Sequence, residues 1–395
     1  TPIRLQTKSS TIRREQHHVP IPADILVPLS VVAFCAVGLA VAGQLDMKAG
    51  APPSTIAATS QASEPRARWR AQPDADTALV RIGFGSCLVQ GRPQPIWKAV
   101  IAARPQTFVM MGDNVYGDFN TADGGKLQAA YAAQLGGADF QRAIASIPML
   151  ATWDDHDYGL NDGGADFAHK AVAAKLFETF WAGSGTLDGI RGPGIAYART
   201  FGPEGRRVQF IMLDTRSFRS PLKRKPKDDK AKGRYVPDDD PEKTLLGAEQ
   251  WAWLGERLRE PADLRVIVSS IQVIADGHRW ERWGNLPIER QKLYALIASA
   301  RARNVVFLSG DRHRAGLYRL TTDGGAALVE ATSSSMNRSF DDPEESGPYQ
   351  VGQMFGANNF GLIEIDWDAR IATISIRDEA GTARRATAIA LAPGP

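Results

Sequence analysis

Residues 147–158 read IPMLATWDDHDY, a short apolar run that leads directly into three carboxylates and a histidine. Short apolar runs bounded by polar residues are typical of buried strands. Carboxylates crowded at the end of such a strand repel one another, which raises their pKa values or destabilises the fold unless cations neutralise them. The stretch therefore predicts a strand of an α/β sheet that ends at a functional site.

Four other apolar runs end in residues of the same chemical kind. They cover residues 79–86, 106–111, 207–213 and 304–309, and they lead into Cys87, Gly112-Asp113-Asn114-Val115-Tyr116, Asp214-Thr215-Arg216 and Gly310-Asp311-Arg312-His313. In open α/β sheets, ligands bind in the crevice beyond the carboxyl ends of the strands. Polar groups at the ends of five strands therefore predict one shared site.

The rest of the pattern indicates how the sheet is covered. Residues 166–183, 247–260 and 288–302 carry apolar side chains every three to four positions, as helices packed on a sheet do. A further run at 264–270 and later runs at 316–320, 327–333, 360–366 and 371–376 read as strands. We therefore predict an α/β layered domain, with the charged, proline-containing residues 223–243 as an exposed loop.

Composition limits the class of partner. The chain has 395 residues, 47 of them basic and 44 acidic, which gives a net charge of +3. This near balance indicates no nucleic-acid partner. One of the two cysteines, Cys35, lies in an apolar run, so the sequence does not indicate a disulfide framework.

The N-terminal region predicts export. Residues 25–45 carry no charge and approach the length of a membrane span, basic residues precede them, and Ala40-Val41-Ala42 fits a signal cleavage pattern. We interpret residues 1–46 as a signal peptide or signal anchor and 47–77 as a flexible linker. Residues 78–395 then form the catalytic domain, which is periplasmic, secreted or attached to a membrane through 25–45.

The residues at the strand ends are suited to two metal ions. Asp113 can bridge both ions with its two oxygens, Asp155 and Asp311 can serve one, and His313, Tyr116 and Cys87 the other. Thiolate and phenolate ligands favour a polarising ion such as ferric iron, whereas oxygen ligands suit calcium, magnesium or manganese. A pair of metal ions can activate water and stabilise an in-line displacement at phosphorus. The site therefore predicts hydrolysis of a phosphate ester.

The motifs, taken in order, resemble those of the alkaline phosphatase D, or PhoD-like, metallophosphatases. They are Gly85-Ser86-Cys87, Gly112-Asp113-x-x-Tyr116, Trp153-Asp154-Asp155-His156-Asp157, Leu213-Asp214-Thr215-Arg216 and Ser309-Gly310-Asp311-Arg312-His313. The resemblance extends from about residue 80 to 367. It implies a four-layer α/β/β/α metallophosphatase sandwich with a dinuclear site between two sheets.

The resemblance also implies the metals. Ferric iron is expected on Cys87, Asp113, Tyr116 and His313, and a second ion, often calcium, around Asp113, Asp155 and Asp311. Manganese or zinc are alternatives. Many other metallophosphatases place Asp-x-His in the first motif and Asn in the third, where this chain has Cys87 and Asp155. The metals of that wider group are therefore not carried over.

Neighbours of the predicted ligands receive different roles. His156 is expected to donate a proton to the leaving group or a hydrogen bond to phosphoryl oxygens. Asp154 and Asp157 either touch metal, orient His156 or cap the following loop. Arg216 either holds phosphate bidentately or pairs with a site carboxylate.

Two polar residues follow the run at 264–270. Gln272, and less so His278, can complete the shell of the second metal, and local hydrogen bonding is the alternative for both.

These observations converge on one hypothesis: an exported, metal-dependent phosphoric-ester hydrolase in which a metal-bound hydroxide attacks phosphorus of a small-molecule ester. A phosphodiesterase or phospholipase-type hydrolase with the same dinuclear site is the first alternative. A non-catalytic, calcium-stabilised binding module is the second, and His156 separates them because a purely structural site does not require it.

Overall fold

The computed structural model describes residues 69–322, 325, 327–340 and 345–392. The chain divides into two units, Thr1–Ala62 and Ser63–Pro395, and all described residues belong to the second. The predicted export segment at 1–46, with its apolar run at 25–45, lies outside them. Within the described ranges, no helix combines the length and apolar character that a membrane crossing requires.

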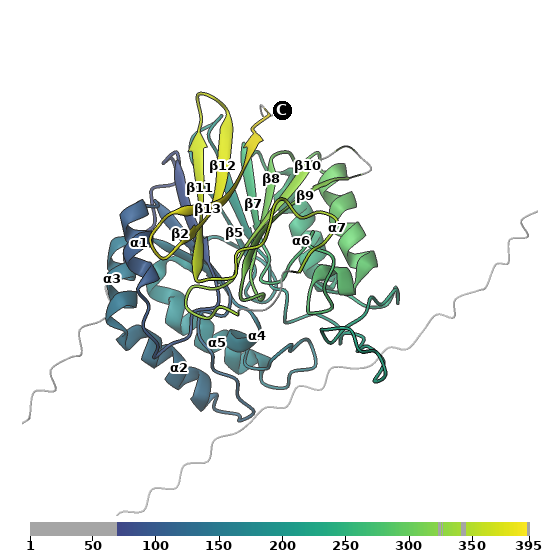
Figure 1. Ribbon diagram of the computed structural model, residues 1–395. Coiled ribbons are helices and arrows are strands. Elements are labelled where there is room, and N and C mark those ends of the chain that lie inside the picture. The colour runs from purple at the N-terminus through teal and green to yellow at the C-terminus, as the bar shows by residue number, and fades with distance from the viewer. Residues whose placement is uncertain (1–68, 323–324, 326, 341–344, 393–395) are drawn as a thin grey trace, which may run out of the picture. The chain divides into compact units, whose positions relative to one another are not determined.

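Two mixed β-sheets form the centre of this unit (Figure 1). The first has the order β13-β12-β11-β1-β2-β3, with β13 Ala383–Ala390, β12 Ile371–Asp378, β11 Asn359–Asp366, β1 Arg81–Gly85, β2 Thr107–Met111 and β3 Met149–Thr152. The second has the order β4-β5-β6-β7-β8-β10-β9, with β4 Ile190–Arg191, β5 Tyr197–Phe201, β6 Val208–Met212, β7 Leu264–Val268, β8 Val305–Ser309, β10 Ala327–Ser333 and β9 Ala315–Thr321. Every strand predicted from the sequence is present.

The central strands of both sheets are buried on both faces because their residues alternate between two apolar layers. On β2, Val109 and Met111 belong to the core between the sheets, which also contains Phe210 and Val266 of the second sheet. Phe108 on the same strand points to the opposite face and packs against Trp97, with ring centroids 5.2 Å apart. This alternation follows from the two-residue period of a strand.

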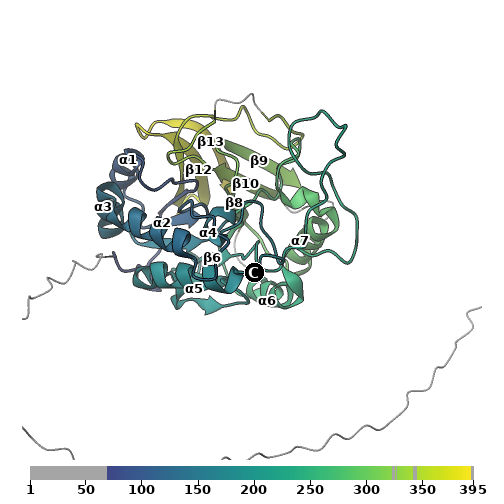
Figure 2. The same ribbon diagram turned by 90° about the horizontal axis from the view of Figure 1, so that it is seen from below.

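Helices cover the outer faces. The helices packed with the first sheet are α1 Ile96–Ala103, α2 Gly125–Gly136, α3 Ala138–Ser146 and α5 Lys170–Trp181, and those packed with the second are α6 Gly247–Arg259 and α7 Pro287–Ser299. Seen from below, the two helical groups lie on opposite sides of the sheets (Figure 2). The predicted four-layer α/β/β/α sandwich is confirmed.

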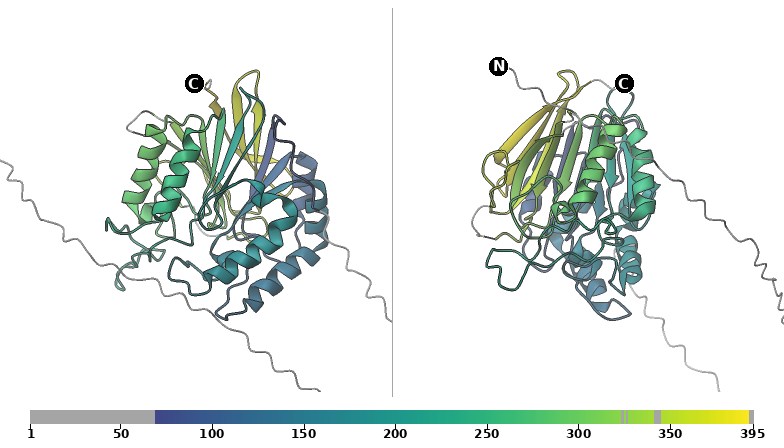
Figure 3. Two further views of the ribbon diagram at one scale, coloured as in Figure 1. Left: turned by 180° about the vertical axis from the view of Figure 1, so that it is seen from behind. Right: turned by 90° about the vertical axis from the view of Figure 1, so that its right-hand side faces the viewer.

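The strand connections bring the site residues to one edge. Strands β1, β2 and β3 run parallel, as do β6, β7, β8 and β10. Thr152 Oγ1 donates a hydrogen bond of 3.0 Å to the Leu213 carbonyl, which joins the ends of β3 and β6 across the two sheets. The loops that follow these strands gather at this edge (Figure 3).

The expected end of the linker at residue 77 needs correction. Trp69 packs against Phe180 and Trp181, with ring centroids 5.8 and 5.4 Å away. The Gln72 side-chain amide donates to the Met149 carbonyl at 2.7 Å. A single indole that fills a gap between helices has no periodic signature, so the polar composition of 69–77 concealed this packed segment.

Candidate metal centre

The loops after β1 and β2 bring a thiol, a carboxylate and a phenol together. Cys87 Sγ lies 3.5 Å from Asp113 Oδ2, and the Tyr116 hydroxyl donates to the same oxygen at 2.8 Å. Burial, reinforced by the Asp113 carboxylate, raises the pKa of Cys87 and of Tyr116 well above their usual values. Both groups therefore need a polarising cation before they ionise and become ligands.

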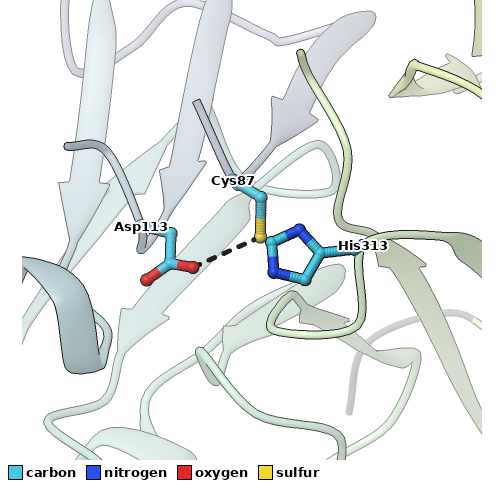
Figure 4. Close-up of side chains that lie close together, drawn as sticks. All are labelled: Cys87, Asp113 and His313. Carbon is cyan, nitrogen blue, oxygen red and sulfur yellow. Dashed lines mark hydrogen bonds between the residues drawn. The ribbon is translucent and has the colours of Figure 1, made fainter. Parts of the chain in front are cut away.

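His313 reaches the same point from the other sheet (Figure 4). Ligand atoms of Cys87, Asp113 and His313 all lie within 4.8 Å of one another. His313 Nδ1 lies 2.8 Å from the Arg338 carbonyl. Because a carbonyl oxygen only accepts hydrogen bonds, Nδ1 carries the proton, and the unprotonated Nε2 is the atom that can bind a metal ion. Burial, with the nearby Arg338 and Arg312 charges, lowers the pKa of His313 to about 3, so the ring is neutral.

A second group of ligand atoms lies beside the first and shares Asp113 with it. Oxygens of Asp113, Asp154, Asp155 and Asp311 lie within 4.8 Å of one another. Burial and the neighbouring carboxylates raise the pKa of Asp113 and of Asp311 well above the ordinary carboxyl range. Among the described residues, Asp155 Oδ1 and Asp154 Oδ2 are buried without a hydrogen-bond partner.

The residues at this point are suited to bind metal ions. Buried, mutually repelling carboxylates with unpaired oxygens are the environment that a bound cation stabilises. Asp113 belongs to both donor groups, which is the arrangement that two neighbouring ions require. The predicted ligands Cys87, Asp113, Tyr116, Asp155, Asp311 and His313 thus lie together around one point.

The backbone at the centre is strained. Cys87, Asp113, Asp311 and His313 have φ angles of 59°, 49°, 63° and 52°. Residues other than glycine rarely adopt positive φ, and such strain concentrates at functional sites. Four of the six predicted ligands share this conformation, which aims their side chains at the common point.

His156 begins a hydrogen-bonded pair at the margin of the centre. It lies on the single-turn helix α4 Asp155–Tyr158, and its Nδ1 is 2.5 Å from Asp118 Oδ2. Its ring centroid is 4.3 Å from that of Tyr116. Burial lowers the pKa of His156, but the carboxylates of Asp155, Asp113 and Asp118 outweigh it and raise the value to about 10. In the protein without bound ions, the His156 ring is therefore protonated at neutral pH.

Asp118 was missed in the sequence, although it stands two residues after Tyr116 in GDNVYGD. Asp162 and Glu281 were also missed, and their oxygens lie within 4.8 Å of Asp155. Asp162 occurs in a glycine-rich turn and Glu281 in a long loop, so neither follows a strand directly and no spacing signal marks them.

Arg216 is completely buried and already has partners. Its guanidinium forms an ion pair with Asp154 and another, of 2.6 Å, with Glu281. Arg219 adds a third contact, 3.1 Å from Glu281. The sequence left two roles open for Arg216, pairing with a site carboxylate and bidentate binding of phosphate. These contacts favour the first.

The Asp157 carboxylate binds backbone N–H groups of two segments. Its carboxylate accepts from the Asp154 N–H at 3.0 Å and from the Asn114 N–H at 3.0 and 3.2 Å. It therefore ties the start of α4 to the loop that carries Asp113, which supports capping rather than metal ligation.

Gln272 lies in a separate buried network. Its amide nitrogen donates to Tyr318 and Thr332 at 3.1 and 2.9 Å, and its oxygen lies 2.8 Å from His278 Nε2. Gln272 belongs to none of the candidate ligand groups found in the described part of the chain. The local role thus has the stronger support for both Gln272 and His278.

Comparisons with known proteins agree with this architecture. The family model described as PhoD-like phosphatase matches residues 197–370. Alkaline phosphatase D of Bacillus subtilis (strain 168) is 28% identical over 222 residues, which cover 50% of this chain and 36% of that protein. The chain thus spans little more than a third of the length of this relative. The resemblance to the PhoD-like family is confirmed.

Solved structures show the same fold. A structure titled "Structure of PhoD" covers 82% of this chain and 72% of its own, with a TM-score of 0.62 and 17% identity. The purple acid phosphatase PPD1 from yellow lupin (Lupinus luteus) seeds covers 80% of this chain and 54% of its own, with a TM-score of 0.53 and 11% identity. At these identities the likeness is one of fold alone.

Proposed function

We propose that this PhoD-like chain is a metal-dependent hydrolase of phosphoric esters. The observation that carries the proposal is the position of Asp113, which is shared by a Cys87–His313 group and an aspartate group. Such a shared carboxylate supports two adjacent metal ions. The matched family, described as phosphatases, supports the same reaction class.

The two donor groups differ in chemistry, which supports different metals. Cys87, Asp113, Tyr116 and His313 would hold ferric iron, and Asp113, Asp155 and Asp311 would hold calcium, with manganese or zinc as alternatives. When bound, these ions would supply Lewis acidity and lower the pKa of a water molecule that serves as nucleophile.

His156 completes the reaction from the protein side. Attack of the water oxygen on phosphorus forms a new P–O bond and breaks the bond to the ester oxygen. The water loses a proton to the solvent, and the departing alkoxide takes a proton. The imidazolium of His156 donates that proton, while Asp118 holds the ring through Nδ1 and leaves Nε2 for the substrate. Arg216 does not touch substrate in this scheme; it neutralises and orients Asp154 beside the centre.

The substrate is a small-molecule phosphate ester, and a phosphodiesterase or phospholipase-type hydrolase remains the second candidate because the same centre can serve it. A non-catalytic calcium module is less well supported, because it gives no use to the His156–Asp118 pair. Export, with the domain periplasmic, secreted or membrane-attached through 25–45, is proposed from the sequence of residues 1–46.

The decisive experiment combines metal analysis of the purified protein with assays on a phosphomonoester and a phosphodiester. We expect two metal ions per chain, hydrolysis of at least one ester, and loss of turnover with unchanged metal content in His156→Ala. A reconstituted protein that hydrolyses neither ester, or a fully active His156→Ala variant, would contradict the proposal.

A further inference from the structure

The segment after β10 lies against the proposed metal centre. The Met336 N–H donates to the Ser86 carbonyl at 3.0 Å, next to Cys87. The Asn337 side chain accepts from the Val89 N–H at 2.7 Å and donates to the Val89 carbonyl at 2.9 Å. Residues 336 and 337 are therefore fixed to the loop that carries the thiol, and the residue that follows is held beside it.

That residue is Arg338, and it contacts two of the predicted ligands. Its guanidinium carbon lies 4.3 Å from the centroid of the Tyr116 ring. Its carbonyl accepts the hydrogen bond from His313 Nδ1. Phe340 flanks it, 6.0 Å from the guanidinium, and also packs against His313 with centroids 4.2 Å apart. The backbone and the ring contacts thus set the position of the charge.

The other arginines near the centre are occupied. Arg216 and Arg219 pair with Asp154 and Glu281, and Arg312 pairs with Glu345. The Arg338 guanidinium has only aromatic contacts among the described residues. An arginine stacked on a ring keeps its in-plane N–H donors available. Arg338 is therefore a positioned cation, partly exposed to solvent, whose donors are not used by any described group.

The substrate of the proposed reaction needs such a group. A phosphoryl group is anionic, and it must approach a centre lined with carboxylates. A guanidinium binds phosphate oxygens through two parallel charge-assisted hydrogen bonds, which fix orientation as well as add affinity. A guanidinium held on Tyr116 loses little freedom on binding, because its position is set before the ligand arrives.

We propose that Arg338 binds the non-ester oxygens of the substrate phosphoryl group, and of inorganic phosphate, at the Tyr116 edge of the centre. The assignment rests on the proposed function, since it names the group that recognises the substrate of that site. Arg338 thereby takes the phosphate-holding role that the sequence pattern suggested for Arg216.

The test measures inorganic phosphate binding to the metal-loaded protein by titration calorimetry. Arg338→Ala is expected to weaken binding roughly 10- to 100-fold, as loss of a charge-assisted pair does, with metal content unchanged. Arg338→Lys is expected to recover part of the affinity, because it keeps the charge but not the planar fork. Arg199→Ala is the matched control, since Arg199 also stacks on a ring, that of Phe201 at 5.0 Å, but lies on β5.

The outcomes separate this inference from the proposed function. Unchanged phosphate affinity in Arg338→Ala overturns the inference, even if esters are hydrolysed normally. Loss of metal in that variant also overturns it, because the Arg338 side chain would then act by positioning the Tyr116 ligand on which it stacks. A wild-type protein that binds phosphate through Arg338 but hydrolyses no ester contradicts the proposed function and leaves the inference intact.

Discussion

His156 and Asp118 show what a single contact contributes at the residue scale. The short hydrogen bond of 2.5 Å fixes which ring nitrogen faces Asp118 and therefore which one faces the centre. Asp118 is partly exposed, and its other oxygen is buried without a partner among the described residues. Asp118 belongs to none of the candidate ligand groups found in the described part of the chain. In the proposed scheme its carboxylate would therefore act through the histidine and not through a metal ion.

Asp118→Asn should lower kcat roughly 10-fold or more, because the amide weakens the orientation and charge of the imidazolium. Metal content and KM should change little. Asp123→Asn is the matched control, since Asp123 lies in the same loop and, within the described part of the chain, its side chain bonds to Thr121 and to the Gly125 N–H. Steady-state kinetics of both variants measure the change in kcat. An equal loss of kcat in both would show that the integrity of the loop matters and not the Asp118–His156 hydrogen bond.

Cys87→Ser should remove one of the two metal ions, because a serine hydroxyl does not ionise where burial already raises the pKa of the thiol. The other ion, held by the aspartates, should remain. Elemental analysis after dialysis measures the stoichiometry. Cys35→Ser makes the same chemical change outside the described domain and should retain both ions; full occupancy in Cys87→Ser would disprove thiolate ligation.

At the scale of elements, a buried ion-pair network holds the site loops together. Arg216 follows β6, Asp154 follows β3, and Glu281 lies in the loop after β7. Each acid is completely enclosed, so its charge depends on the guanidinium for stabilisation. The network therefore couples three loops, and the position of Asp154 beside the metal centre depends on all of them.

Arg216→Met should destabilise the domain by about 3–5 kcal/mol, since removal of one member leaves buried charges unpaired. Arg142→Met removes an exposed pair with Asp139 and should cost no more than about 1 kcal/mol. Denaturant unfolding of the two variants measures the difference. A similar small loss of unfolding free energy in both variants would mean that Asp154 and Glu281 are protonated and need no charged partner.

At the scale of the whole molecule, the centre lies where the two sheets meet. Cys87, Asp113 and Asp155 come from the first sheet, and Asp311 and His313 from the second. Without cations, buried carboxylates from both sheets repel each other across this edge. Bound metal should therefore act as a connection between the two halves of the sandwich.

Chelation should lower the melting temperature, and resupplied metal should restore it, because ions that bind only the folded chain stabilise it. The difference in melting temperature between the metal-loaded and the metal-free protein should grow as pH rises. Burial raises the pKa of Asp113 and Asp311, so their protonated forms stabilise the metal-free fold at low pH and this contribution is lost as pH increases. Calorimetric melting over a pH series checks this; a constant difference would contradict it.

Much of the fold, and the grouping of the candidate ligands at one edge, was predictable because the signals are local. Strands such as 106–111 are short apolar runs, and the residues that follow them must emerge at the sheet edge. The sequence thus predicts that Cys87, Asp113, Tyr116, Asp155, Asp311 and His313 gather at one edge, and in the structure they lie together. Trp69 could not, because its packing depends on a gap between helices that no neighbouring residue encodes.

Short segments of the sequence encode the layered architecture and the side chains that follow each strand, since periodicity and strand-end position are properties of such segments. The tertiary structure alone decided how the remaining polar groups pair: Asp118 with His156, Arg216 with Asp154 and Glu281, and Arg338 with the Tyr116 ring. These pairings join loops distant in the chain. The motifs had left open that Arg216 pairs with a site carboxylate, without naming which one. Their geometry depends on how two sheets pack, and no spacing along one segment records it.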